Sequence, residues 1–184
     1  VMIEVQVLNV APEIVSLSLS SASIDEGQSV IVAGTFTDAA LGVATETFTG
    51  TALWSDGVTT AVVISGDSFS TTRSFPDDDP ASGTAFDVFT VAVTISDDDL
   101  GSDTATSPEL TVHNVAPEIL SMSLSSASIN EGQSVTVSGT FSDPALGVPT
   151  ETFTGTALWS DGMSTALTID SDGSLIRQVT RTPL

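Results

Sequence analysis

Apolar and polar residues alternate along most of this chain, and this period of two predicts strands rather than helices. The longest such run covers residues 86–96, where Phe89, Val91, Val93 and Ile95 alternate with polar or small residues. Runs of Asp, Gly and Ser separate the alternating segments at regular intervals and are typical of turns. We therefore expect seven strands in the first part of the chain, at residues 14–20, 29–37, 51–55, 59–65, 69–75, 86–96 and 104–113.

A long internal repeat organises the sequence. Residues 9–64 recur as residues 114–169, and 44 of the 56 aligned positions are identical. An offset of 105 residues matches whole domains in series rather than the short units of a solenoid. We accordingly predict three segments: the last strand of a preceding repeat at 1–8, a complete repeat at 9–113, and a truncated second repeat with a divergent C-terminal tail at 114–184.

The two copies together indicate which face of the strand at 29–37 is buried. Val30, Val32 and Phe36 share one face and are unchanged in the second copy. Ile31 and Ala33, on the other face, are replaced there by threonine and serine. Because polar replacements belong on the solvent side of a sheet, the face that carries Val30 should point inward.

This pattern predicts an all-β fold made of tandem immunoglobulin-like β-sandwiches, with about seven strands per repeat and an incomplete second repeat. A tryptophan on the third strand is a common core residue of such sandwiches, so Trp54 and its counterpart Trp159 are expected inside. The second repeat lacks counterparts of the last two strands, and two of the three arginines lie in its divergent tail. That shift in composition suggests a foreign or frame-shifted end.

An incomplete sandwich would leave strand edges and an apolar face open to water. One hypothesis is that residues 1–8 of a neighbouring molecule fill this gap, which would give a homo-oligomer or filament by strand exchange. The segment suits this role because residues 4–8 lie 105 positions before residues 109–113, the predicted last strand. The alternative is that other contacts cover the second repeat or that it pairs with itself.

The composition excludes several classes of function. The formal net charge is −21, from 24 acidic residues and three Lys or Arg, and such a surface repels nucleic acids and anionic membranes. The chain has no cysteine, which rules out disulfides, thiolate metal sites and cysteine nucleophiles. No apolar run is long enough to span a bilayer and no signal peptide opens the chain, so we expect any export signal to lie outside these residues.

Several motifs, taken in order, resemble PKD-type immunoglobulin-like repeats of bacterial extracellular and surface proteins. They are Asn9-Val-Ala-Pro12, Glu26-Gly27, Gly34-Thr-Phe-Thr-Asp38, Trp54-Ser-Asp-Gly57 and the strand from Phe89 closed by Asp97-Asp-Asp-Leu-Gly101. Ser55 departs from the pattern, because the family usually has glycine there. The resemblance implies a sandwich fold, a location outside the cell or on its surface, and Ca²⁺ near the domain start, with Asn9, Asp38 and Asp97 as ligands.

Strand direction gathers the acidic loops at the two ends of a sandwich. The loops after the second and sixth predicted strands should meet beside the domain start, which assembles Asn9, Asp38, Asp97, Asp98 and Asp99, with Asn114 and Asp143 as the equivalents in the second repeat. Carboxylate and amide oxygens are ligands that Ca²⁺ takes. The other interpretation is that these residues cap turns and keep the protein soluble. A second acidic group, Asp25, Glu26, Asp56 and residues 77–79, is expected at the opposite end.

Enzymatic motifs are absent from the sequence, and its one histidine, His113, falls at a strand end. We therefore expect a non-catalytic structural or adhesive spacer of a long secreted or cell-surface protein, stiffened by Ca²⁺, in contact with neighbouring repeats and self-associating by strand exchange. The alternative is an accessory module of a secreted hydrolase that binds polysaccharide or protein fibres. A row of exposed aromatic side chains on one sheet face would favour this alternative.

Overall fold

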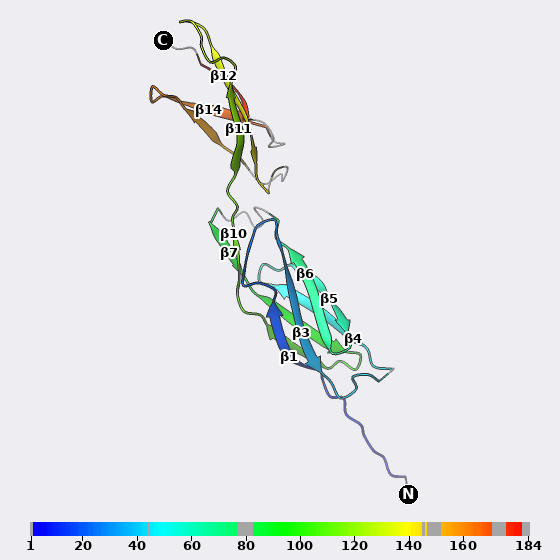
Figure 1. The fold of residues 1–184 in the computed structure, drawn as a ribbon. Coiled ribbons are helices and arrows are strands. Elements are labelled where there is room, and N and C mark those ends of the chain that lie inside the picture. Colours follow the sequence, from blue (N-terminus) through cyan, green and yellow to red (C-terminus); the bar gives the residue numbers. More distant parts are fainter. Residues whose placement is uncertain are drawn as a thin grey trace. The chain divides into compact units, whose positions relative to one another are not determined.

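The computed structural model describes residues 2–43, 45–76, 83–144, 146 and 152–170, together with the main chain of 176–181. Two compact units divide the chain (Figure 1): the first comprises Val1–Phe75 and Ala85–His113, the second Pro76–Thr84 and Asn114–Leu184. All regular elements in the described part are strands, as the period-two pattern predicts. No helix among these residues has the length and apolar character needed to cross a membrane.

Ten strands build the first unit. In chain order they are β1 (Glu13–Leu19), β2 (Ser23–Asp25), β3 (Ser29–Thr37), β4 (Phe48–Trp54), β5 (Thr59–Ser65), β6 (Ser68–Ser74), β7 (Phe86–Phe89), β8 (Val91–Asp97), β9 (Ser102–Thr106) and β10 (Leu110–His113). The strand expected at 51–55 begins earlier, at Phe48. The strands expected at 86–96 and 104–113 are each divided in two, and β2 was not expected at all.

The strands of the first unit form a two-layered sandwich. The larger sheet has the order β1-β3-β6-β5-β4-β8-β9, and β5 connects its two halves. The first half of β5 pairs with β4, whereas Val63–Ser65 pairs with β6. Side chains of β3 and β6 therefore face those of β4 and β8 across a single core. This arrangement is an immunoglobulin-like sandwich, as the sequence predicted.

The break between β7 and β8 has a local cause in hydrogen bonding. Thr90 interrupts the strand because its main-chain N–H and C=O both bond to Ser55. Ser107 and Pro108 make the corresponding break between β9 and β10. The Ser107 hydroxyl accepts the Val91 N–H at 3.0 Å, and Pro108 has no N–H to offer a ladder. The short strands β7 and β10 then form a separate sheet of order β2-β10-β7.

The predicted inward faces are confirmed. Val30, Val32 and Phe36 are fully buried, whereas Ile31 on the opposite face of β3 is 48% exposed. Trp54 is buried in the centre of the sandwich, and the alternating apolar residues of β7 and β8 pack against it in the same core. Each of these large side chains contributes about 1.5–3 kcal/mol by its removal from water.

The second unit repeats half of this design. Its strands are β11 (Glu118–Leu124), β12 (Val135–Ser142), β13 (Gly155–Leu158), β14 (Ser164–Ile169) and β15 (Ile176–Arg181). Their order, β11-β12-β15-β14-β13, is that of β1-β3-β6-β5-β4 in the first unit. β15 takes the place of β6, so the divergent tail supplies a strand that its sequence did not predict. The main chain of Arg181 pairs with Val135 as that of Arg73 pairs with Val30.

Among the described residues of the second unit, no strands correspond to β7–β10, which cover the core of the first. Val135, Val137 and Phe141 of β12 are buried, but every residue of β11 is exposed, among them Met122 at 72%. Trp159 is only half-buried, so the expectation of a core tryptophan holds fully for Trp54 alone. The reason is that no described residue of this unit occupies the place of β8.

Candidate functional site

The acidic loops predicted to meet do so at one end of the first unit, which we call the acidic pole. β1 begins there and β3 ends there, since Glu13 pairs with Thr37. β4 begins and β8 ends at the same place, since Phe48 pairs with Asp97. The acidic pole therefore collects the segment before β1 and the loops that follow β3 and β8 (Figure 1).

Asp97 is the buried centre of the acidic pole. Its Oδ2 accepts a hydrogen bond from Asn9 Nδ2 at 2.9 Å, and its Oδ1 accepts one from Gly101 N at 2.7 Å. The carboxylate thus fastens the β8–β9 loop to the segment that leads into β1. Gly101 has no room for a side chain, because an added Cβ would lie 2.4 Å from Asp97 Oδ2 and 2.8 Å from the Cα of Ala11.

Asp38 has one satisfied carboxylate oxygen and one orphaned one. Its Oδ1 accepts the main-chain N–H of Ala40 at 2.7 Å, which caps the turn after β3. Its Oδ2 is hidden from solvent and has no hydrogen-bond partner in the described part of the chain. A buried acceptor without a partner costs about 1–3 kcal/mol, and a cation or a water molecule is the usual remedy.

Glu46 and Asp98 form a carboxyl pair with opposite shifts. Burial, followed by its hydrogen bond to Asp98 and the negative charges of Asp98, Asp38 and Asp97, raises the pKa of Glu46. The Thr47 N–H, which donates to Asp98 Oδ1 at 3.2 Å, is the main cause that lowers the pKa of Asp98. Glu46 therefore retains its proton to a higher pH than an ordinary glutamate. Sequence reasoning missed Glu46, because its loop carries no motif.

The structure thus brings four of the predicted site residues together with Glu46: Asn9, Asp38, Asp97 and Asp98. Asp99 lies exposed in the β8–β9 loop. In the second unit, Asn114 and Asp143 line a cavity of about 240 Å³ together with Thr152 and Phe153.

Among the described residues, no three His, Cys, Asp or Glu side chains stand in an arrangement that could hold a metal ion as they are. One oxygen of Asp97 and one of Asp38 already accept main-chain hydrogen bonds in turns, and the second oxygen of Asp97 accepts one from Asn9. These bonds agree with the interpretation that the residues cap turns.

The expected acidic group at the opposite end of the first unit is not a group of free carboxylates. Asp56 forms a bidentate ion pair with Arg73, with one of its bonds at 3.0 Å from Nη1 to Oδ1. The hydrogen bonds from Arg73 are the largest cause that lowers the pKa of Asp56. The expected members at 77–79 lie outside the described residues.

Glu26 also behaves differently from a solvated acid. It is 9% exposed, its N–H donates to His113 O at 2.9 Å, and its Oε2 has no partner among the residues described. His113, the one histidine, lies beside the ring of Phe86 with centroids 6.2 Å apart. Through these contacts His113 helps to pack the end of β10 against neighbouring segments.

The outer face of the β1-β3-β6 layer is hydroxylated. A shallow groove of about 450 Å³ runs over it, lined largely by Ser and Thr side chains: Ser16, Ser18, Thr35, Ser65, Ser68 and Ser70. In the described part of the chain, Phe86 is the one aromatic residue with an exposed side chain, at 52%. The described sheet faces therefore carry no row of exposed aromatic side chains.

Comparisons with known proteins give distant similarities. No family model matches the sequence, and no curated protein matches it significantly. The Yersinia pseudotuberculosis adhesin InvE is similar with 14% identity over 90% of this chain and 49% of that one, at a TM-score of 0.37. The Escherichia coli adhesin FdeC is similar with 13% identity over 91% of this chain and 55% of that one, at a TM-score of 0.38.

The chain spans about half the length of each of these two structures. Because both TM-scores are below 0.5, the fold assignment rests on the strand order and core of the chain itself. The likeness to PKD-type repeats stays a resemblance of motifs, since no family model matches.

Proposed function

We propose that this chain is a non-catalytic spacer or adhesive segment of a longer secreted or cell-surface protein. The observation that carries the proposal is the position of the two ends of the first unit. β1 begins beside the end of β3, whereas β10 ends beside Asp25, just before β3 begins. Since the two ends of β3 lie at opposite poles, the chain passes through the unit from one pole to the other. Modules of this kind add length when joined in series.

The dimensions and pairing of the strands suit a spacer. Residues 86–97 run the length of the first unit, and twelve extended residues span roughly 40 Å. The first and last strands of the unit are held along their sides, β1 by β3 and β10 by both β2 and β7. Tension between the poles therefore loads the hydrogen bonds of these ladders together rather than one after another.

The surface favours a spacer over the alternative accessory module. A polysaccharide-binding face usually presents aromatic rings, whereas the described outer face of the first unit presents hydroxyl groups. A net charge of −21 keeps such modules soluble and apart from anionic partners. Within the described residues, no observation favours a polysaccharide or fibre ligand.

Calcium binding at the acidic pole is the second element of the proposal. The carboxylates of Asp38, Asp97 and Asp98 repel one another there. Burial is the largest cause that raises the pKa of Glu46, and the charges of these three residues add to it. A Ca²⁺ ion takes six to eight oxygen ligands and would relieve this repulsion. The partnerless Asp38 Oδ2 is the oxygen that gains most. Binding requires some side chains to turn, since no ready-made site is found in the described part of the chain.

The calcium element is tested by titration calorimetry and by thermal melting of the full chain in millimolar Ca²⁺ and in excess EDTA. We expect a higher melting temperature with Ca²⁺ and a loss of this difference in Asp38→Asn. Asp25→Asn is the matched control, because the second repeat itself carries asparagine at this position. Identical melting with and without Ca²⁺ would remove calcium from the proposal.

The spacer element is tested by small-angle X-ray scattering on chains with one, two and three copies of residues 9–113. The core of the first unit consists of its own residues, so each copy is expected to fold. We expect the maximum dimension to increase by roughly 40 Å per copy. A maximum dimension that stays nearly constant while the mass triples would show side-by-side packing and refute the spacer.

End-to-end self-association through strands is the third element of the proposal. The second unit leaves β11 exposed, and residues 2–8 carry exposed apolar side chains outside any strand. Both features belong to the same chain, so copies of it offer each other a complementary pair of surfaces.

A further inference from the structure

Nearly identical sequences adopt different structures in the two units. Residues 20–30 and 125–135 differ at one position, where Asp25 is replaced by Asn130. In the first unit Ser23–Asp25 form β2, whereas residues 128–130 form no strand. β2 pairs with β10 alone. The missing strand therefore reflects a missing partner and not a different local sequence.

Two main-chain hydrogen bonds define what that partner supplies. Thr111 N donates to Ala22 O at 3.0 Å, and Glu26 N donates to His113 O at 2.9 Å. The matching atoms of the second unit are Ala127 O and Glu131 N, and neither has a hydrogen-bond partner among the described residues. Residues 127–131 thus form an edge of defined register with which no described residue of the second unit pairs, and we call it the acceptor edge.

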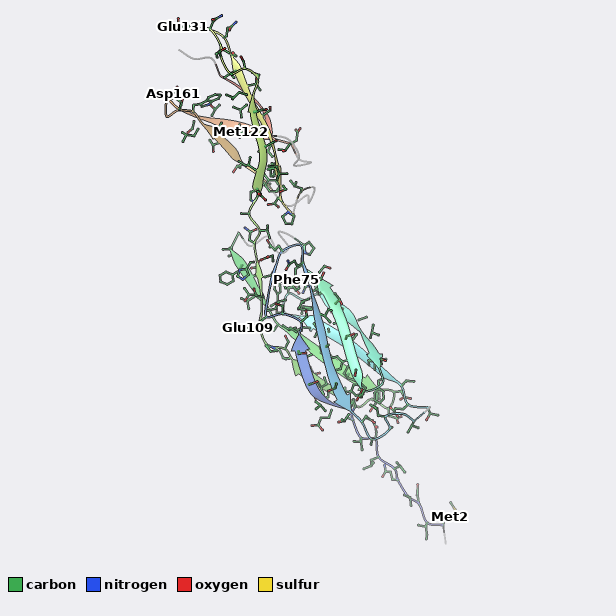
Figure 2. All side chains as sticks on the ribbon, in the orientation of Figure 1. Met2, Phe75, Glu109, Met122, Glu131 and Asp161 are labelled. Carbon is green, nitrogen blue, oxygen red and sulfur yellow. The ribbon has the colours of Figure 1, made fainter. Side chains whose placement is uncertain are left out.

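The chain carries a second copy of the strand that fills this edge in the first unit. Residues 4–8 lie 105 positions before residues 109–113, and Val5 and Val7 fall at the places of Leu110 and Val112. Leu110 and Val112 are buried, at 0% and 3% exposure, whereas Val5 and Val7 are 78% and 90% exposed. Figure 2 shows this N-terminal segment, with Met2 at its tip, extending away from the strands of the first unit.

We infer that residues 4–8 of one molecule, the donor segment, pair in parallel with the acceptor edge of a second molecule. In this pairing Gln6 N donates to Ala127 O, and Glu131 N donates to Leu8 O. Val5 and Val7 turn inward, as Leu110 and Val112 do in the first unit. The inference deepens the self-association in the proposed function by naming its two surfaces and their register.

A second copy of this chain is the occupant that the contacts favour. The first unit has no vacancy for the donor segment, because its own β10 already holds the edge of β2. The described residues of this chain comprise one donor segment and one acceptor edge, so the contact between two copies is head-to-tail and propagates into linear assemblies. Because each molecule carries a net charge of −21, mutual repulsion opposes the contact and salt should strengthen it.

Register-specific cross-linking tests the pairing directly, since the chain has no cysteine of its own. Thr111 lies opposite Ser23 in the first unit, so Gln6 should lie opposite Ser128. We would mix a Gln6→Cys chain with a Ser128→Cys chain that carries an added tag, and oxidise the mixture. The expected product is the mixed disulfide dimer, because parallel neighbours lie within disulfide distance.

The matched control is Ser126→Cys, two residues and about 7 Å out of register. We expect at least a tenfold lower yield of the mixed dimer with this partner. Equal yields for Ser126→Cys and Ser128→Cys, or no mixed dimer with either, would overturn the inference.

Sedimentation of the unmodified chain over a range of concentrations provides a second measurement. We expect the average mass to rise to at least twice that of the monomer, and to rise further in 0.5 M salt. Gln6→Pro removes the N–H that should donate to Ala127 O and is expected to abolish association. Ile3→Pro is its control, because Ile3 lies outside the donor segment and the matching position of the first unit is itself a proline, Pro108. A monomer at every concentration, or equal loss in both variants, would refute the pairing.

The monomeric Gln6→Pro chain separates this inference from the spacer proposal. Because this variant should not associate, small-angle X-ray scattering from it reports the shape of single molecules and tests the spacer proposal alone. An extended monomer without cross-linking would refute the pairing alone. Cross-linking between compact monomers would refute the spacer alone.

Discussion

Arg73 lies inside the first sandwich and donates two hydrogen bonds to the carboxylate of Asp56. Its side chain is 8% exposed. The guanidinium also stacks on aromatic rings of the core, 4.9 Å from the centroid of Trp54 and 4.5 Å from that of Phe75. A buried charge therefore joins the turn after β4 to β6 and to the centre of the core.

Asp56→Ala should destabilise the first unit strongly. Removal of one partner leaves the Arg73 charge buried without compensation, which costs about 3–5 kcal/mol in comparable cases. Urea denaturation monitored by tryptophan fluorescence measures the change. Asp99→Ala, an exposed acid in the β8–β9 loop, is the control and should change the free energy of unfolding by less than about 0.5 kcal/mol. The prediction fails if both variants unfold at the same urea concentration.

The pKa shift of Asp56 predicts loss of stability in acid. Its pKa is lowered from 3.8 in the folded protein, so the ion pair contributes fully above that pH. The contribution is lost as pH falls below about 4 toward the lowered folded value. Melting temperatures between pH 7 and pH 2.5 should therefore fall more steeply for the unmodified chain than for Asp56→Asn. Parallel curves would contradict the assignment.

Glu46→Gln should stabilise the first unit at neutral pH, whereas loss of the Asp56 carboxylate should destabilise it. Because the pKa of Glu46 is raised, the carboxyl group favours the folded state only while it is protonated, and the benefit is lost as pH rises. We expect Glu46→Gln to raise the melting temperature at pH 7 and to have little effect below pH 4. A variant that melts below the unmodified chain at pH 7 would show that the charge of Glu46 is needed at the acidic pole.

The two tryptophans give a matched pair for the difference between the units. Trp54→Ala should cost about 3–5 kcal/mol, as expected for a large side chain removed from a closed core. Trp159→Ala should cost clearly less, since Trp159 is only half-buried. Chemical denaturation of each variant, followed by the circular dichroism of the β-strands in both units, measures both costs. Equal costs would mean that the second unit is as fully covered in solution as the first.

Gly101→Ala tests the packing of the acidic pole. The added methyl group would meet Asp97 Oδ2 and the main chain of Ala11 at 2.4 and 2.8 Å, and crowding of this kind costs about 1–3 kcal/mol. The neighbouring change Leu100→Gly should instead be neutral or stabilising, because Leu100 has a φ of 73° that glycine adopts more readily. The melting temperatures of both variants, compared with that of the unmodified chain, measure these two effects. A neutral Gly101→Ala would show that the β8–β9 loop can move away from Asp97.

The sequence by itself determined most strands of the first unit, their inward faces and the meeting of the acidic loops. Alternation with a period of two places Val30, Val32 and Phe36 on one side whatever the partner strand is, and the second copy identifies that side. The poles follow as well, because the direction of β3 and β8 decides which loops meet. Asn9, Asp38 and Asp97 could therefore be placed together from the chain order.

Tertiary structure decided the features that depend on a distant partner. Alternation places Arg73 on the same face of β6 as Phe69, but it does not show what holds a charge there. In the folded unit the rings of Trp54, Phe75 and Phe89 and the carboxylate of Asp56 surround the guanidinium. Glu46 joins the acidic pole only because its loop folds over Asp98. Residues 20–30 and 125–135 make the same point most directly, since a strand forms only where β10 is present. A strand needs the main-chain groups of another segment, and no local pattern can say whether that segment is there.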